Sequence, residues 1–182
     1  MVTKDNMADV KKQLEQTVKE LPDFDKIKDN IDMTITNEGL RIEMTESATG
    51  TFFDRDSPKI SGDGSQMLVA LAQELGKLPN TIALEGHTDS KPYAAGAAYT
   101  NWELSANRVN AARRLMMQTG IRPDQVTQVR GFADQRLRKS DAPLDPANRR
   151  ISLIVQYREK SPEELEKEVA EAEKRRGRRQ GR

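Results

Sequence analysis

The stretch Thr81-Ile-Ala-Leu-Glu-Gly-His-Thr-Asp-Ser90 carries the strongest indication of the fold. Residues 81–85 alternate between apolar and other side chains, so they predict a strand with Ile82 and Leu84 on one face. Gly86 would let backbone amides approach a ligand, and Thr88 and Asp89 add side-chain oxygens. Ligands of α/β proteins bind beyond the carboxyl ends of strands, so this segment predicts a binding edge. A turn in which Asp89 only caps neighbouring amides is an equally good interpretation.

Helices are expected on both sides of this strand. Before it, Ser61 can cap a helix with apolar residues at helical spacing from Met67 to Leu78, which ends at Pro79-Asn80. After it, Thr100-Asn-Trp-Glu103 has the form of a capping box, and the helix that follows runs to Gly120. The central strand is therefore flanked by two amphipathic helices.

The remaining strands complete an α/β pattern. Residues 31–35 and 40–44 alternate on either side of Asn37-Glu-Gly39, which predicts a β-hairpin. Further strands are expected at 125–131 and 150–157, and residues 46–64 read as a loop with Phe52-Phe53 buried. The order hairpin, helix, strand, helix, strand, loop, strand predicts an α/β two-layer sandwich, in which a mixed sheet has both helices on one face.

The two ends of the chain are more strongly charged. Residues 5–21 predict a helix that Pro22 ends, with a narrow apolar stripe that suits a partner or a second copy. Packing of that stripe on its own domain is the equal alternative. Ser161-Pro-Glu-Glu164 opens another helix, which decays into a basic tail at 174–182 that is either solvated or attracted to phosphate-rich surfaces.

We therefore divide the chain into three regions. Residues 1–30 form a linker helix region, residues 31–158 form the domain with its motif core at 81–157, and residues 159–182 form the charged helix and basic tail.

Composition excludes several classes of site. Without cysteine there are no disulfides, thiolate nucleophiles or cysteine zinc sites, and a single histidine argues against a metal site or acid–base catalysis. No cofactor or metal is expected. The net charge of +1 gives no general attraction to nucleic acid. The longest apolar run, residues 67–72, is too short to span a bilayer, and the N-terminus lacks an apolar signal region. The protein is cytosolic, or a targeting segment lies outside this sequence.

A second group of charged side chains is expected near the binding edge. Arg108 follows Leu104 by four residues and so lies near the inward face of its helix, where it needs a structural anion or a ligand. Asn101 begins the same helix, whose N-terminus favours an anion. We interpret His87 as a hydrogen-bonding strut rather than a metal ligand or base, and Trp102 as a core residue or helix staple rather than a sugar platform.

Four motifs in order carry a family resemblance. They are Gly86-His-Thr-Asp89, Asn101-x-x-Leu-Ser-x-x-Arg108, Gly131 and Asn148-Arg-Arg150. Together they resemble the signature of the OmpA-like peptidoglycan-binding domain, over about residues 40–157. Within that group, Pro92-Tyr93, the longer 91–99 segment and Tyr99-Thr-Asn-Trp-Glu-Leu-Ser105 are similar to the MotB family of flagellar stator proteins.

The resemblance implies a function and a set of site residues. It implies a non-catalytic anchor that holds the flagellar stator to peptidoglycan, with Asp89 facing the ammonium and Arg108 the carboxylate of diaminopimelate in the peptide stem. Thr88, Asn101, Leu104, Ser105, Phe132 and Arg149 are implied lining residues. It further implies a homodimer in the periplasm and a MotA-type membrane partner. The transmembrane helix of the bacterial inner-membrane protein is absent from this sequence.

Two other functions are compatible with the same residues. One is an OmpA-like wall-binding domain of a lipoprotein, outer-membrane or secretion-system protein that has no link to motility. The other is an enzyme that cleaves glycosidic bonds with Asp89 and either Glu85 or Glu103, since paired carboxylates can perform this reaction.

Overall fold

The computed structural model describes residues 6–158 and 162–180 and contains one five-stranded sheet. In chain order the strands are β1 (Ile31–Ile35), β2 (Gly39–Thr45), β3 (Ile82–His87), β4 (Val126–Gly131) and β5 (Arg150–Gln156). Their order in the sheet is β1-β2-β5-β3-β4, and all neighbours are antiparallel except β3 and β4, which are parallel. The mixed sheet is thus confirmed.

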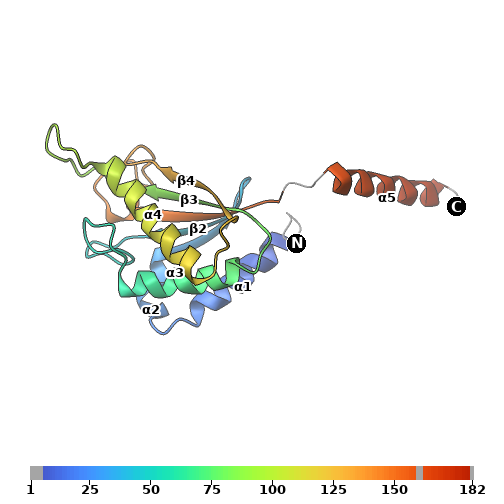
Figure 1. Cartoon of the computed structure of the whole chain (residues 1–182), viewed down its shortest axis with the longest axis horizontal. Coiled ribbons are helices and arrows are strands. Elements are labelled where there is room, and N and C mark those ends of the chain that lie inside the picture. Colours follow the sequence, from blue (N-terminus) through green and yellow to red (C-terminus); the bar gives the residue numbers. More distant parts are fainter. Residues whose placement is uncertain (1–5, 159–161, 181–182) are drawn as a thin grey trace.

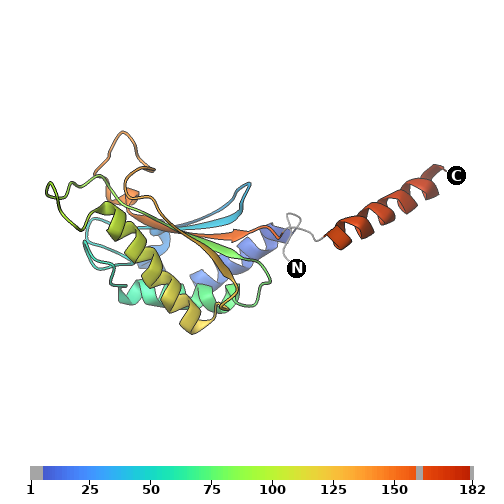
Figure 2. The ribbon, with the colours of Figure 1, turned by 45° about the horizontal axis from the view of Figure 1, so that its top comes forward.

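The helices pack on one face of this sheet (Figures 1 and 2). The long ones are α1 (Met7–Lys19), α3 (Gly62–Leu75) and α4 (Asn101–Thr119); α2 (Phe24–Ile27), η2 (Lys28–Asn30) and η3 (Pro146–Asn148) are short. α3 contacts α4, and α4 contacts β3 and β4. The predicted two-layer sandwich with both central helices on one face is therefore confirmed.

Alternation along the strands separates the two faces of the sheet. Leu84 of β3, Ile42 of β2 and Leu153 of β5 are buried in the core beneath the helices, together with Leu71 of α3 and Ala112 of α4. On each strand, the residues immediately before and after the core residue point to the opposite face. Burial of apolar surface in this single layer is the main stabilising contribution to the domain.

The apolar stripe of α1 is part of the same core. Met7, Val10, Leu14 and Val18 are all buried there, and α1 contacts α3, β1 and β2. Of the two alternatives for this helix, packing on its own domain is the one observed, so the stripe does not support dimerisation. The helix ends at Lys19, shortly before Pro22, and residues 1–5 lie outside the described part of the chain.

Local signals set the ends of the central helices. The Ser61 hydroxyl accepts a hydrogen bond from the Gly64 amide at 3.0 Å, and the capping box formed by Thr100 and Glu103 is present. Both predicted caps are therefore confirmed. The first helix ends at Leu75 rather than near Pro79, and the chain then turns before β3.

The C-terminal helix extends away from the sheet (Figure 1). α5 spans Pro162–Gln180, so the helix continues through most of the segment expected to be a basic tail, and that boundary was wrong. The predicted cap at Ser161 lies outside the described residues.

Gly86 is needed for the packing of β3 against α4. A Cβ atom at this position would lie 2.3 Å from the Ser105 carbonyl oxygen and 2.5 Å from Cγ2 of Val109. The glycine therefore serves helix–strand contact, and not the approach of a ligand that the sequence suggested.

Gly86→Ala should lower the free energy of unfolding by about 2–4 kcal/mol, because the added methyl group forces α4 away from the sheet. Gly62→Ala is the matched control: no atom lies within 4 Å of a Cβ there, so its stability should match or slightly exceed that of the wild type. Urea denaturation of both variants measures the difference. Equal midpoints for the two variants would contradict the proposed close packing.

Candidate functional site

A pocket of about 350 Å³ opens beyond the carboxyl end of β3. It lies between the loop after β2, the segment between β3 and α4, the first turn of α4 and the residue before β5. Its lining residues are Asp56, Asp89, Lys91, Pro92, Tyr93, Ala94, Tyr99, Asn101, Leu104 and Arg149. This is the sheet edge at which the sequence predicted a binding site.

Asp89 and Arg149 form a largely buried ion pair in this pocket. Arg149 Nη1 lies 3.2 Å from Asp89 Oδ2, and the side chains are only 13% and 8% exposed. Asp89 Oδ1 accepts a hydrogen bond from the Lys91 amide at 3.1 Å, while Arg149 Nη2 donates to the Ser47 carbonyl at 2.9 Å. Removing one member of such a pair leaves an uncompensated charge and costs about 3–5 kcal/mol.

Arg108 is buried but does not line the pocket. Its Nε donates to the Ser57 carbonyl at 2.8 Å, Nη2 donates to the Asp54 carbonyl at 3.3 Å, and the guanidinium lies 5.1 Å from the Phe53 ring centroid. Burial lowers the pKa of Arg108, and the nearby Glu46 carboxylate opposes this. The structure thus pairs Asp89 with Arg149, and Arg108 fixes the loop that contains Asp56.

Glu46 organises the same loop from its other side. Its carboxylate accepts hydrogen bonds from the amides of Thr51, Phe52 and Phe53 at 2.6, 3.2 and 3.1 Å. Burial raises the pKa of Glu46, against the effect of these donors and of Arg108. The loop after β2 is therefore held in place by one buried anion and one buried cation.

Three other predicted site residues do not line the pocket. The hydroxyl of Thr88 donates to the Asp89 carbonyl at 2.9 Å, and that of Ser105 accepts from the Ala133 amide at 3.1 Å. Phe132 stacks on His87 with centroids 5.0 Å apart. These contacts join the end of β3 to α4 and to the segment after β4.

Asn101 and Leu104, two of the implied site residues, line this pocket, and Asn101 Nδ2 donates to the Lys91 carbonyl at 3.1 Å. The sequence prediction missed two lining residues of opposite charge, Asp56 and Lys91. Asp56 has a positive φ of 54°, which is uncommon outside glycine. Its position in a Ser-, Asp- and Pro-rich loop gave no sign that the loop folds back to the end of β3.

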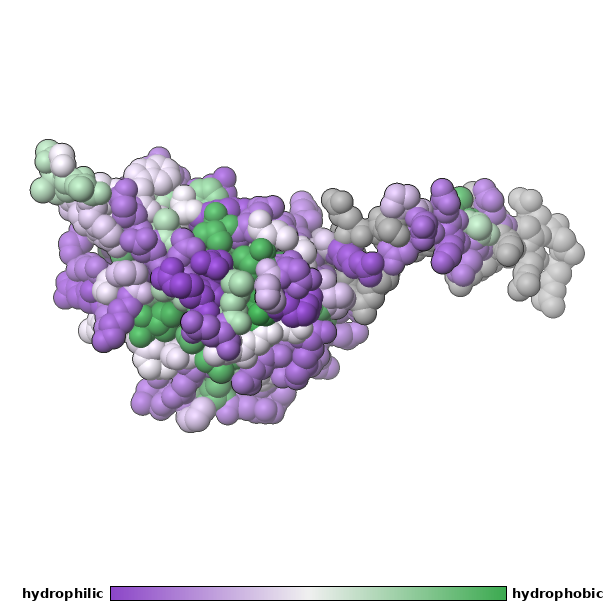
Figure 3. Space-filling model, in the orientation of Figure 1, coloured by the Kyte–Doolittle hydropathy of each residue, from purple (hydrophilic) through white to green (hydrophobic). Residues whose placement is uncertain are grey.

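The loop between β3 and α4 projects from the body (Figure 1), and its tip is apolar in the space-filling view (Figure 3). Tyr93 and Tyr99 are partly exposed, with ring centroids 6.2 Å apart. Trp102 is 53% exposed, so its interpretation as a core residue or helix staple was wrong. Aromatic surface is thus available beside the charged pocket.

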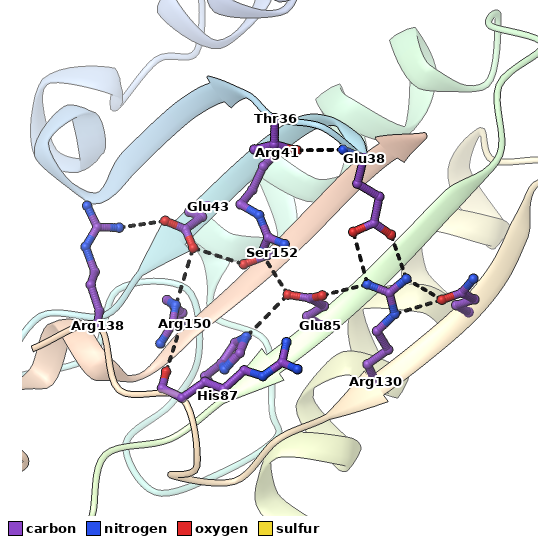
Figure 4. A network of polar contacts seen from close by, with 12 residues as sticks. Thr36, Glu38, Arg41, Glu43, Glu85, His87, Arg130, Arg138, Arg150 and Ser152 are labelled. Atoms are coloured by element: carbon purple, nitrogen blue, oxygen red, sulfur yellow. Dashed lines mark hydrogen bonds and ion pairs between the residues drawn. The ribbon is translucent and has the colours of Figure 1, made fainter. Parts of the chain in front are cut away.

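An ion-pair network covers the other face of the sheet, with the helices behind it (Figure 4). Glu85 lies 2.7 Å from Arg41 and 2.8 Å from Arg130, and Arg130 also contacts Glu38 at 2.6 Å. Burial acts to raise the pKa of Glu85, but hydrogen bonds from His87, Arg41 and Arg130 hold it well below its usual range. In the described part of the chain no helix covers this face, and the network lies there instead.

His87 belongs to this network. Its Nε2 lies 3.5 Å from Glu85, which agrees with a strut, and its buried Nδ1 has no hydrogen-bond partner among residues 6–158 and 162–180. Neither glutamate of the enzyme interpretation lies with Asp89 in the pocket, because Glu85 is held on the outer face and Glu103 is engaged in the capping box.

The mixed sheet, its one-sided helices and the charged pocket at a strand end define a small two-layer α/β domain with a candidate binding pocket. A family model described as "OmpA family" matches residues 52–150, more than half of the 182 residues. The chain therefore belongs to the OmpA family.

The chain is also similar to individual known proteins. The chain is 38% identical over 143 residues to "Motility protein B" of Escherichia coli strain K12, covering 78% of this chain and 46% of that protein. It thus spans about half the length of this relative. In fold it is similar to the periplasmic domain of Helicobacter pylori MotB, with a TM-score of 0.63 and 18% identity over 78% of this chain and 91% of that one.

A second solved structure shares the fold. It is titled the cell wall anchor of the T6SS from Pseudomonas aeruginosa, with a TM-score of 0.60 and 19% identity over 80% of this chain and 97% of that one. Among residues 6–158 and 162–180, no helix has both the length and the apolar character needed to cross a membrane.

His87 should give the protein a measurable pH dependence of stability. Burial keeps the pKa of folded His87 below the ordinary value of 6.5, so the unfolded chain takes up its proton first as the pH falls. The free energy of unfolding should decrease below pH 6.5, by at most about 1.4 kcal/mol per pH unit for one proton. Urea denaturation at pH 7.5 and 5.5 measures this slope. His87→Gln should reduce it, and an unchanged slope would contradict a neutral buried imidazole.

Proposed function

We propose that this domain is a non-catalytic peptidoglycan-binding anchor of the flagellar stator, which holds the ion-driven complex to the cell wall. The observation that carries the proposal is the pocket with its Asp89–Arg149 pair, in an OmpA-family chain 38% identical to Motility protein B. Torque needs a fixed point on the wall, and a binding domain without catalytic groups provides one.

The pocket suits a ligand end with both charges. Its lining side chains include two carboxylates and two cations, so a zwitterion can be bound without a net charge being left inside. The free end of diaminopimelate in the peptide stem carries one ammonium and one carboxylate. We place the ammonium between Asp89 and Asp56, which both line the pocket, and the carboxylate beside Arg149.

Arg108 has a positioning role in this proposal. Two of its nitrogens are engaged by loop carbonyls, so it acts by holding residues 54–57 at the pocket rather than by meeting the ligand carboxylate directly. Thr88 and Ser105 likewise act indirectly, through hydrogen bonds to the Asp89 carbonyl and from the Ala133 amide.

The apolar part of the lining fits the rest of the ligand. Tyr93, Tyr99 and Leu104 can pack along the methylene chain of diaminopimelate, while the exposed ring of Trp102 is available to an adjoining sugar. Asn101 adds a polar group at the start of α4, where the helix dipole favours a carboxylate.

The relatives suggest a location and partners. We propose that the domain functions in the periplasm of a bacterium as part of an inner-membrane protein, with a MotA-type membrane protein and a second copy of the chain as partners. Nucleic acid is not a proposed ligand. The proposed homodimer rests on the family resemblance alone, since the stripe of α1 is buried in the domain.

A wall anchor unconnected with motility is the second candidate. The fold likeness to a T6SS cell wall anchor favours it, but that likeness concerns the fold, whereas the sequence identity favours a stator. Restoration of swimming by a stator protein carrying this domain, in a strain lacking its own, would favour the first candidate. Wall binding without such restoration would favour the second.

The domain should sediment with purified peptidoglycan, and Asp89→Asn should weaken this binding at least about tenfold, because the ligand ammonium loses a carboxylate partner in the pocket. The same change can lower stability, so circular dichroism must show that the variant is folded. Tyr93→Ala, at a partly exposed position, provides a second variant that should weaken binding with little effect on folding.

Asp25→Asn is the matched control, since this carboxylate is 93% exposed and does not line the pocket. It should sediment like the wild type. Undiminished sedimentation of both folded pocket variants would rule out the pocket as the wall-binding site.

A further inference from the structure

An ion pair crosses the mouth of the pocket. Lys91 Nζ lies 3.0 Å from Asp56 Oδ2, and both residues line the cavity. They come from the loop after β2 and from the segment after β3, 35 positions apart in the chain. This contact links two of the segments that line the pocket.

The two ion pairs of the pocket differ in burial. The side chains of Lys91 and Asp56 are 55% and 43% exposed, against 13% and 8% for Arg149 and Asp89. An exposed pair contributes little to stability, whereas opening a buried pair leaves charges without solvent or partner. An incoming ligand will therefore displace the Lys91–Asp56 contact far more easily than the Asp89–Arg149 contact.

Lys91 and Asp56 also differ in how freely each can move. Lys91 carries three donors on a flexible chain, and its ammonium can turn to another acceptor within reach. Asp56 is held in a left-handed backbone conformation, in a loop that Arg108 fixes through the Asp54 and Ser57 carbonyls. Exchange is thus expected to move Lys91 while Asp56 keeps its place.

We propose that Lys91–Asp56 is an exchangeable ion pair that selects the zwitterionic end of diaminopimelate. On binding, the ligand ammonium takes the place of Lys91 beside Asp56, and the released Lys91 binds the ligand carboxylate together with Arg149. Asp89 and Arg149 remain paired and form the floor of the site. This inference rests on the proposed wall-binding function. It adds Lys91 as the residue that determines which stem peptide the domain prefers.

The exchange predicts a specific selectivity. A stem peptide with lysine in place of diaminopimelate keeps the ammonium but lacks the carboxylate, so Lys91 would lose Asp56 and gain no new partner. The wild-type domain should therefore prefer the diaminopimelate peptide, and this preference should depend on Lys91.

Calorimetric titration of the whole chain with two synthetic stem tripeptides, one ending in meso-diaminopimelate and one in lysine, tests the proposal. The wild type should bind the first at least about tenfold more tightly, which is the ratio that 1.4 kcal/mol gives. Lys91→Gln should reduce the ratio to about threefold or less, mainly by weakening the diaminopimelate peptide. Asp56→Asn should weaken both peptides by similar factors, because both present an ammonium.

Lys59→Gln is the matched control, because Lys59 belongs to the same loop, lies 3.5 Å from Asp54 and does not line the pocket. It should keep the wild-type ratio. Urea midpoints of all variants check that folding is unchanged.

The outcomes separate the two proposals. If Lys91→Gln binds the diaminopimelate peptide with an unchanged ratio, the exchange is wrong, although wall binding stands. If the wild type binds neither tripeptide and does not sediment with peptidoglycan, the proposed function itself fails. Wild-type binding of both peptides with equal affinity also overturns the exchange.

Discussion

The contact between β3 and α4 at Gly86 is the constraint on which the binding site depends. With no side chain at this position, the helix backbone at Ser105 approaches the strand closely enough to exclude even a methyl group. The first turn of α4 is thereby placed beside the end of β3, so Asn101 and Leu104 face the same pocket as Asp89. The hydroxyl of Ser105 then ties this region to Ala133, which joins three segments around one sheet edge.

Burial of β3 on both faces makes this edge rigid. One face supplies Leu84 to the apolar core, while the other places Glu85 between Arg41 and Arg130. On the outer face, an ion-pair network thus takes the place of a second helical layer. The stability of this network depends on pairing its charges rather than on burying apolar area. A site held at the end of such a strand loses little conformational freedom on binding, which suits the proposed anchor.

The sequence predicted the elements well, because they rest on local signals such as the capping box at Thr100 and the alternation around Ile42. It also located Asp89, Asn101, Leu104 and Arg149, which line the observed pocket. It could not show that Asp89 pairs with Arg149, because this depends on how a long loop places a side chain 60 positions away. Asp56 was missed for the same reason. The sequence also left open whether α1 packs on its own domain, because an amphipathic stripe has the same residue spacing whether a partner or its own sheet covers it.

Chemical-shift mapping of the domain with a stem peptide ending in diaminopimelate tests the central claim most directly. The account predicts shifts for amides of residues 54–57, 89–91, 93, 94 and 101, and for the side chain of Arg149, with none on the outer face around Arg41 and Arg130. Shifts confined to the outer face or to α5, with the pocket unperturbed, would contradict it.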